Sequence, residues 1–138
     1  MFEKILVAYD GSVSAEHAFE LACDLAQKYT AVLRVVAVVR PPEFGEEVET
    51  EAIVEHSRKH YHQVLKPLKE RATLKGLVAE FEVVVGHPAA RIVLEAEKWG
   101  ARLIVVGHLG RGLIGRWLVG SVAKQVMHHA PCAVLVAR

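Results

Sequence analysis

The sequence lacks the features of membrane, secreted, and metal- or disulfide-stabilised proteins. No apolar run approaches the ~20 residues that a membrane-spanning helix needs. The first residues, MFEKILVAYDGS, show no basic start followed by a long apolar stretch, as a signal peptide would. The two cysteines, Cys23 and Cys132, are far apart and form no CxxC pair, so we expect small apolar core residues and no redox or zinc centre. These absences predict a cytoplasmic protein with no membrane partner.

Aromatic residues are scarce throughout, and acidic residues are absent from the last part of the chain. Aromatics form 7% of the sequence and are not interleaved with bases, so nucleic acid is not an expected partner. Residues 98–138 contain no Asp or Glu and six Lys or Arg, whereas residues 1–97 hold all 16 acids and 11 bases. This basic, glycine-rich segment is a candidate anion site. The alternative is that the acidic part of the chain neutralises it in the fold.

The residues that are present predict one α/β domain over residues 1–138. Apolar runs predict strands, and helical spacing of apolar residues predicts helices between them. The expected strands are 4–9, 32–39, 79–85, 101–107 and 132–137, and the expected helices are 12–29, 54–75, 89–98 and 121–129. Residues 43–55 hold six glutamates and no base, which indicates a solvated loop running into a helix. Pro67 should kink that helix or remove one of its hydrogen bonds.

Strict alternation of buried strands and helices predicts a doubly wound parallel sheet with helices on both faces. In such a sheet, ligands bind outside the carboxyl ends of the strands, where the strand order reverses. Three segments meet that description: Asp10-Gly11-Ser12, residues 38–40, and a glycine-rich loop after the fourth strand.

The glycine-rich loop, residues 107–121, is the strongest candidate site. It has five glycines in fifteen residues and no acid, and glycine lets a backbone approach a ligand closely. Gly120-Ser121 opens the predicted fourth helix, where free N–H groups and the helix dipole favour a phosphate. Two common phosphate motifs are excluded. The GxGxxG at Gly110 has no acid after it to hold a ribose, and the P-loop-like spacing from Gly115 lacks the lysine.

The spacing Gly107-x-x-Gly110, nine residues, then Gly120-Ser121 resembles the ATP-binding branch of the universal stress protein family. The resemblance covers the whole chain and includes KILVAYDGS at the start, LIVVG before the loop, and HAPCAVLVAR at the end. It implies a Rossmann-like five-stranded sheet in the order 3-2-1-4-5, with ATP held at the carboxyl ends of the strands. The residues that it places at the nucleotide are Ala8, Asp10, Val38, Gly107, Gly110, Arg111, Gly120, Ser121, Val122 and Ala123.

Within this resemblance the loop holds the phosphates and ribose, Asp10 contacts the nucleoside, and the backbone of Val38 contacts adenine. Leu109 departs from the family pattern, because that position is often polar or basic and a leucine side chain cannot bind phosphate. Asp10 is also a candidate ligand of Mg²⁺ beside a triphosphate, since Mg²⁺ often uses one or two carboxylates plus phosphates. The other interpretation of Asp10 is a turn residue that bonds its own backbone.

Three functions remain open from the sequence. The first is a small cytoplasmic ATP-binding protein of the stress response, a nucleotide-responsive homodimer that signals to an unknown downstream protein. The second is a weak Mg²⁺-dependent ATPase or phosphohydrolase, although we find no catalytic constellation. The third is a dimerisation module whose loop binds nothing. The dimer is predicted from residues 133–137, AVLVA, because an apolar edge strand recruits a second strand. The rival is a monomer in which residues 40–60 cover that strand.

Overall fold

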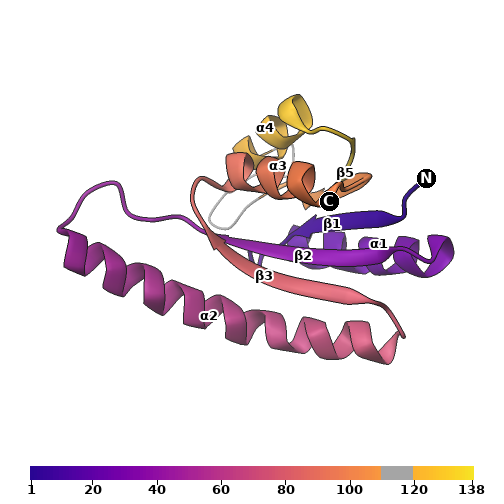
Figure 1. The fold of residues 1–138 in the computed structure, drawn as a ribbon, viewed down its shortest axis with the longest axis horizontal. Coiled ribbons are helices and arrows are strands. Elements are labelled where there is room, and N and C mark those ends of the chain that lie inside the picture. The colour runs from indigo at the N-terminus through magenta and orange to yellow at the C-terminus, as the bar shows by residue number, and fades with distance from the viewer. Residues whose placement is uncertain (110–119) are drawn as a thin grey trace.

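The computed structural model describes residues 1–109 and 120–138, and its helices and strands alternate along the chain as the sequence predicts (Figure 1). In order they are β1 (Lys4–Ala8), α1 (Val13–Tyr29), β2 (Val32–Val39), α2 (Glu47–Leu74), β3 (Ala79–Val85), α3 (Pro88–Trp99), β4 (Leu103–Gly107), α4 (Ser121–His129) and β5 (Ala133–Ala137). Ser12 caps α1 by accepting a hydrogen bond from the Ala15 N–H at 3.1 Å. Gly100 ends α3 in the left-handed conformation, with φ 77°.

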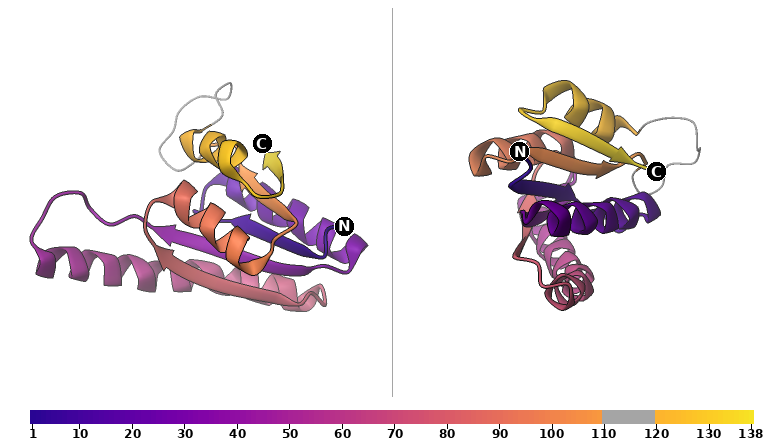
Figure 2. Two further views of the ribbon diagram at one scale, coloured as in Figure 1. Left: turned by 45° about the horizontal axis from the view of Figure 1, so that its top comes forward. Right: turned by 90° about the vertical axis from the view of Figure 1, so that its right-hand side faces the viewer.

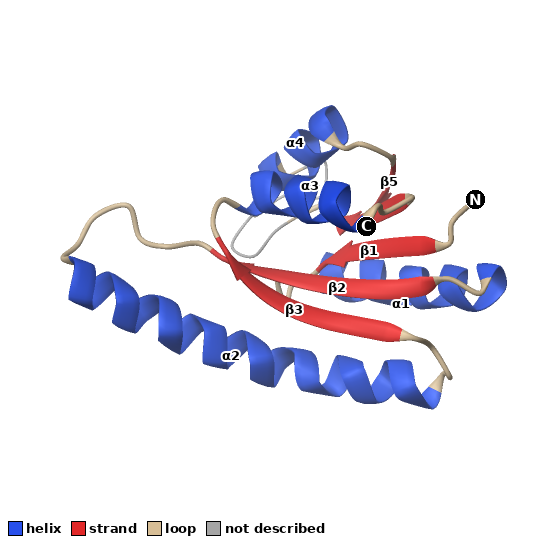
Figure 3. Cartoon of the chain, viewed as in Figure 1, coloured by secondary structure: helices blue, strands red, loops and turns tan. Residues whose placement is uncertain are grey.

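The five strands form one parallel sheet in the order β3-β2-β1-β4-β5, which confirms the predicted fold class (Figure 3). The strand order reverses between β1 and β4, because the chain moves outward from β1 through β2 to β3 and then returns to the other side of β1. That switch point is where a doubly wound sheet offers room for a ligand.

Helices cover both faces of the sheet and enclose two cores (Figure 2). The central strand β1 shows the division: Ile5 and Val7 enter the core with α1 and α2, whereas Leu6 and Ala8 enter the core with α3 and α4. Side chains of a strand alternate between faces, so a strand with helices on both sides must be apolar throughout. This is the reason for the uninterrupted apolar runs in the sequence.

Helix α2 is longer than predicted. It begins at Glu47, so the expectation of a loop through residue 55 is wrong for its helical part. Its buried residues, Leu65, Leu68 and Ala72, all lie in its second half, and the first half extends beyond the sheet (Figure 1). Glutamate is a good helix former and is favourable near a helix N-terminus, but a segment with no buried face shows no apolar periodicity. The helix continues through Pro67, whose missing N–H removes one hydrogen bond.

The long helix α2 lies on the β3 side of the sheet, where it packs on β3 and β2. Strand β5 is at the opposite edge. The alternative in which residues 40–60 cover the last strand is therefore wrong for this fold: the segment and the strand belong to opposite edges.

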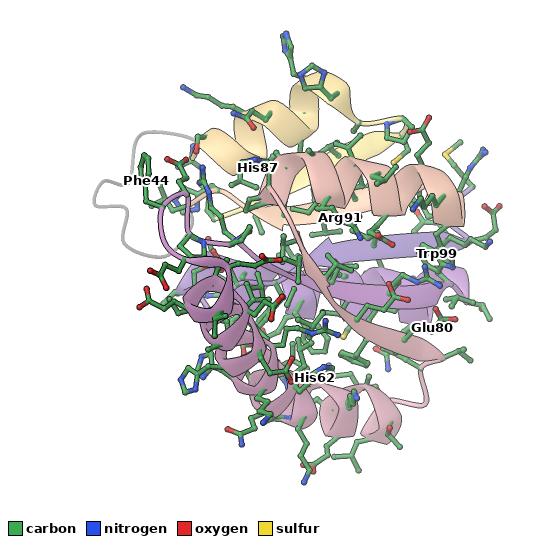
Figure 4. The ribbon with its side chains drawn as sticks, turned by 60° about the vertical axis from the view of Figure 1, so that its left-hand side comes forward. Phe44, His62, Glu80, His87, Arg91 and Trp99 are labelled. Carbon is green, nitrogen blue, oxygen red and sulfur yellow. The ribbon has the colours of Figure 1, made fainter. Side chains whose placement is uncertain are left out.

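Cys23 and Trp99 both act as packing residues. Cys23 is fully buried, and this burial raises the pKa of its thiol, whereas Cys132 is half-buried. Trp99, at the C-terminal end of α3 (Figure 4), lies under the guanidinium of Arg34, 4.6 Å from the ring centroid. Arg34 also forms an ion pair with Glu80 on β3. None of the helices in the described ranges is long and apolar enough to cross a membrane.

Candidate functional site

A cavity of about 510 Å³ opens at the carboxyl ends of the strands, at the β1–β4 switch point. Every predicted site residue within the described ranges lines it: Ala8, Asp10, Val38, Gly107, Gly120, Ser121, Val122 and Ala123. Gly110 and Arg111, also predicted, lie outside the described residues. The cavity thus gathers residues that are up to 115 positions apart between Ala8 and Ala123, because parallel strands end at the same edge.

The start of α4 forms one wall of the cavity. Gly120 is the N-cap, with φ −61° and ψ 156°, and no side chain in the described ranges caps the helix. Its first turn carries no acidic residue. The first N–H groups of a helix have no partner within the helix, and they carry the positive end of its dipole. This wall is therefore suited to an anion.

The two ends of the glycine-rich loop are joined at the cavity. The Gly120 N–H donates to the His108 carbonyl at 2.5 Å, and the His108 N–H donates to the Ala137 carbonyl of β5 at 2.7 Å. The base of the loop is therefore bonded to the last strand of the sheet.

Gly107 is required by the packing of α1 against the end of β4. A Cβ atom at this position would collide with Ser14 Oγ and would lie 2.8 Å from the Ser14 carbonyl carbon. Helix α1 passes this close to the end of β4, so a side chain on Gly107 would push the two apart. The sequence pattern that suggests a phosphate site thus has a second, structural cause at this glycine.

Asp10 takes part in a local turn and also lines the cavity. Its Oδ1 accepts a hydrogen bond from the Ser12 N–H at 2.9 Å, as in the turn interpretation. Among the described lining residues it is the only carboxylate. No group of three or more potential metal-ligating side chains occurs in the described part of the chain, so a cation here would need additional oxygens from a ligand such as a phosphate.

The sequence did not point to the side of the cavity formed by α2. Ser57 and Tyr61 line it from this side, because α2 reaches past the sheet. Ser57 and Tyr61 do share the helical stripe of Leu65, and that stripe was the only available signal. From the sequence, residues on such a stripe are interpreted as core residues. In the structure, Ser57 and Tyr61 line the cavity instead.

A half-buried polar network supports the cavity wall at Tyr9. The Tyr9 hydroxyl donates to Glu16 at 2.8 Å, and Arg71 of α2 donates to the same carboxylate at 2.9 Å. Burial and the Glu16 carboxylate raise the pKa of Tyr9, which stays a neutral donor. Burial opposes ionisation of Glu16, but the bonds from Arg71 and Tyr9 outweigh it and lower its pKa. The network joins β1, α1 and α2 beside Asp10.

The histidines lie outside the cavity, except His108. His56 and His60 are exposed on α2. His17 is directed at the end of β5, with its Nδ1 2.5 Å from the Arg138 carbonyl oxygen. The His108 ring lies beside the Ala137 carbonyl at 3.2 Å, where it lines the cavity.

A doubly wound parallel sheet with a cavity at its switch point, walled by a helix N-terminus, defines a class of α/β ligand-binding domains. The protein belongs to the universal stress protein family, whose family model matches residues 1–138.

Relatives in sequence and structure agree with this assignment. The chain is 36% identical over 140 residues to a protein named for the same family in Staphylococcus haemolyticus, covering 99% of this chain and 85% of the relative. It superimposes on the universal stress protein UspA from Lactobacillus plantarum with a TM-score of 0.93 and 27% identity, covering 99% and 98% of the two chains. A universal stress protein solved in complex with cAMP matches with a TM-score of 0.76 and 26% identity, covering 99% and 97%.

Proposed function

We propose that the protein is a cytoplasmic stress-response regulator that binds ATP in the switch-point cavity and acts as a homodimer on a downstream protein. The observation that carries the proposal is the convergence of Asp10, Val38 and the start of α4 on one cavity of about 510 Å³. A related protein with the same fold was solved in complex with cAMP, an adenine nucleotide.

The cavity offers different chemistry at its two sides. Ala8, Val38 and Ile92 supply apolar surface for a purine ring, and the backbone of Val38, past the end of β1, supplies hydrogen bonds. The N-terminus of α4 lies across the cavity and suits the phosphates. The ribose then lies between them, near Asp10. This orientation assigns Val38 to the purine, Asp10 to the ribose and the start of α4 to the phosphates.

The test is to identify what the native protein carries. Protein purified without added nucleotide is denatured, and the released small molecules are separated and identified by mass. We expect ATP. A protein that releases no nucleotide and shows no heat of binding with ATP would contradict the proposal and favour the dimerisation module. Free phosphate that accumulates while bound ATP falls would favour the weak ATPase.

Asp10 should contribute more to ATP affinity when Mg²⁺ is present than when it is absent. We expect Asp10→Ala to weaken ATP binding more in Mg²⁺ than in EDTA, because a carboxylate can reach a phosphate-bound Mg²⁺. Calorimetric titration in both buffers measures the difference. Asp24→Ala, which removes an exposed carboxylate paired with Lys28 on α1, is the matched control and should change neither value. Equal losses in both buffers would make Asp10 a nucleoside contact, and no loss would leave only its turn role.

The proposed dimer rests on the edge of β5, which among the described residues has a strand neighbour on one side only, β4. Residues 134–136 are half-buried although they end the sheet, and Met127 on the adjoining helix α4 is 45% exposed. An unpaired apolar edge is normally covered by another strand. Pairing of β5 with β5 of a second copy about a two-fold axis would continue the sheet and close the assembly.

A further inference from the structure

Ser14 has a buried hydroxyl that does not cap helix α1. It is the second residue of α1 and is 5% exposed, one of two polar or charged residues that are buried in the described part of the chain. Ser12 already caps the helix. A buried hydroxyl without a partner is costly, so the partners of Ser14 indicate what the residue does.

The two shortest hydrogen bonds of the Ser14 hydroxyl go to the backbone of Leu109, and a longer contact of 3.5 Å goes to the Ser12 hydroxyl. Its hydroxyl donates to the Leu109 carbonyl at 2.7 Å and accepts from the Leu109 N–H at 3.3 Å. Leu109 lies two residues beyond the end of β4, in the first part of the glycine-rich loop, where the chain leaves the sheet. One side chain on α1 thus satisfies both polar groups of a residue that no longer has a strand partner.

The bonds to Leu109 complete a chain of contacts that runs to the start of α4. His108 is bonded to Ala137 of β5 and accepts from the Gly120 N–H. The close approach of α1 at Gly107 brings Ser14 within reach. The loop base is therefore held from three directions: by β5, by α4 and, through Ser14, by α1.

We propose that Ser14 is a positioning residue for the phosphates of the bound nucleotide, an inference that rests on the proposed function. Ser14 does not line the cavity and instead holds the backbone at Leu109, and through His108 the start of α4, in the binding arrangement before ATP arrives. A site that is ordered in advance loses less entropy on binding. The leucine at position 109 then serves through its backbone, which explains why an apolar side chain is acceptable where the family often has a polar one.

This role predicts an effect that depends on the phosphates. Adenosine has the purine and ribose but no phosphate, so its affinity should depend mainly on Val38 and Asp10 and much less than that of ATP on the loop base. If Ser14→Ala only destabilised the fold, it would weaken the binding of ATP and of adenosine equally. The comparison of ATP with adenosine therefore separates positioning from general destabilisation.

The experiment titrates ATP and adenosine into the wild type, Ser14→Ala, Ser14→Thr and Thr73→Ala. Thr73 is the matched control, because its hydroxyl bonds a backbone carbonyl, that of Lys69, away from the cavity. We expect Ser14→Ala to weaken ATP binding about 5- to 10-fold, the effect of losing one or two hydrogen bonds, and to leave adenosine within about 2-fold. Ser14→Thr keeps the hydroxyl and should restore ATP binding, and Thr73→Ala should match the wild type.

Amide hydrogen exchange in the ligand-free protein gives an independent measurement. Exchange of the Leu109 N–H should be faster in Ser14→Ala than in the wild type, while amides in β1 and β4 keep their rates. Equal weakening of ATP and adenosine, or an unchanged Leu109 rate, would overturn the inference. If Ser14→Ala binds ATP as tightly as the wild type does, only this inference is overturned. If the wild type binds no ATP, the proposed function is overturned together with this role of Ser14.

Discussion

Replacement of Gly120 by valine should abolish ATP binding and leave cooperative unfolding in place. Gly120 is buried at the N-cap of α4, and its N–H donates to His108. Its φ of −61° is open to any residue, so valine causes no backbone strain. The branched side chain would instead occupy cavity space where the proposed phosphates meet the helix N-terminus.

The expected loss of ATP affinity is large because hydrogen bonds from helix N–H groups to a phosphate are charge-assisted. Loss of two hydrogen bonds to a charged group, each worth about 1.5–3 kcal/mol, weakens binding by about 100-fold or more. Calorimetric titration with ATP measures the affinity, and thermal unfolding followed by circular dichroism measures the fold.

Gly76→Val is the control for stability alone. Gly76 follows the end of α2, away from the cavity, with φ 71°, and a Cβ atom added to it would meet no other atom within 4 Å. Valine there is strained by the backbone conformation, so the variant should unfold at a lower temperature and still bind ATP like the wild type. An unchanged ATP affinity in Gly120→Val would remove the start of α4 from the site.

The sequence was sufficient to predict a parallel sheet with helices on both faces, because that architecture depends on patterns that are local in the chain. The run KILVA of β1 is apolar on both faces, and the same holds for LIVVG of β4. Such runs, separated by amphipathic helices, allow few topologies. The family resemblance supplied the strand order, and the structure confirms it.

The start of α2 could not be predicted, since residues 47–53 have no buried face to give a periodic signal. Two residues of the candidate site were also missed, because Ser57 and Tyr61 line the cavity only where the helix extends beyond the sheet. Ser12 and Ser14 both lie at the start of α1, where serine is a favoured cap, and the sequence does not distinguish them. In the structure Ser12 bonds the Ala15 N–H as the cap, and Ser14 bonds Leu109, a contact that depends on the approach of α1 to the end of β4.

Val136→Pro should convert the proposed dimer into monomers. The Ala137 carbonyl accepts from His108 and therefore faces β4, so by strand alternation the N–H of Val136 faces the open edge of the sheet. Proline removes that N–H and is tolerated at an edge. The sheet within one chain keeps its hydrogen bonds, whereas pairing with a second β5 loses a donor on both copies, since a two-fold axis repeats the change.

Val83→Pro is the matched control at the opposite edge. The N–H of Gly86 donates to Val39 and faces β2, so the N–H of Val83, three residues earlier, faces outward on β3. Light scattering at micromolar concentration should give the mass of two chains for the wild type and Val83→Pro, and of one chain for Val136→Pro. ATP affinity should change little in either variant, because the bond between His108 and Ala137 remains. A single-chain mass for the wild type would contradict the dimer, and dissociation by both variants would mean that proline acts through the fold and not through the β5 edge.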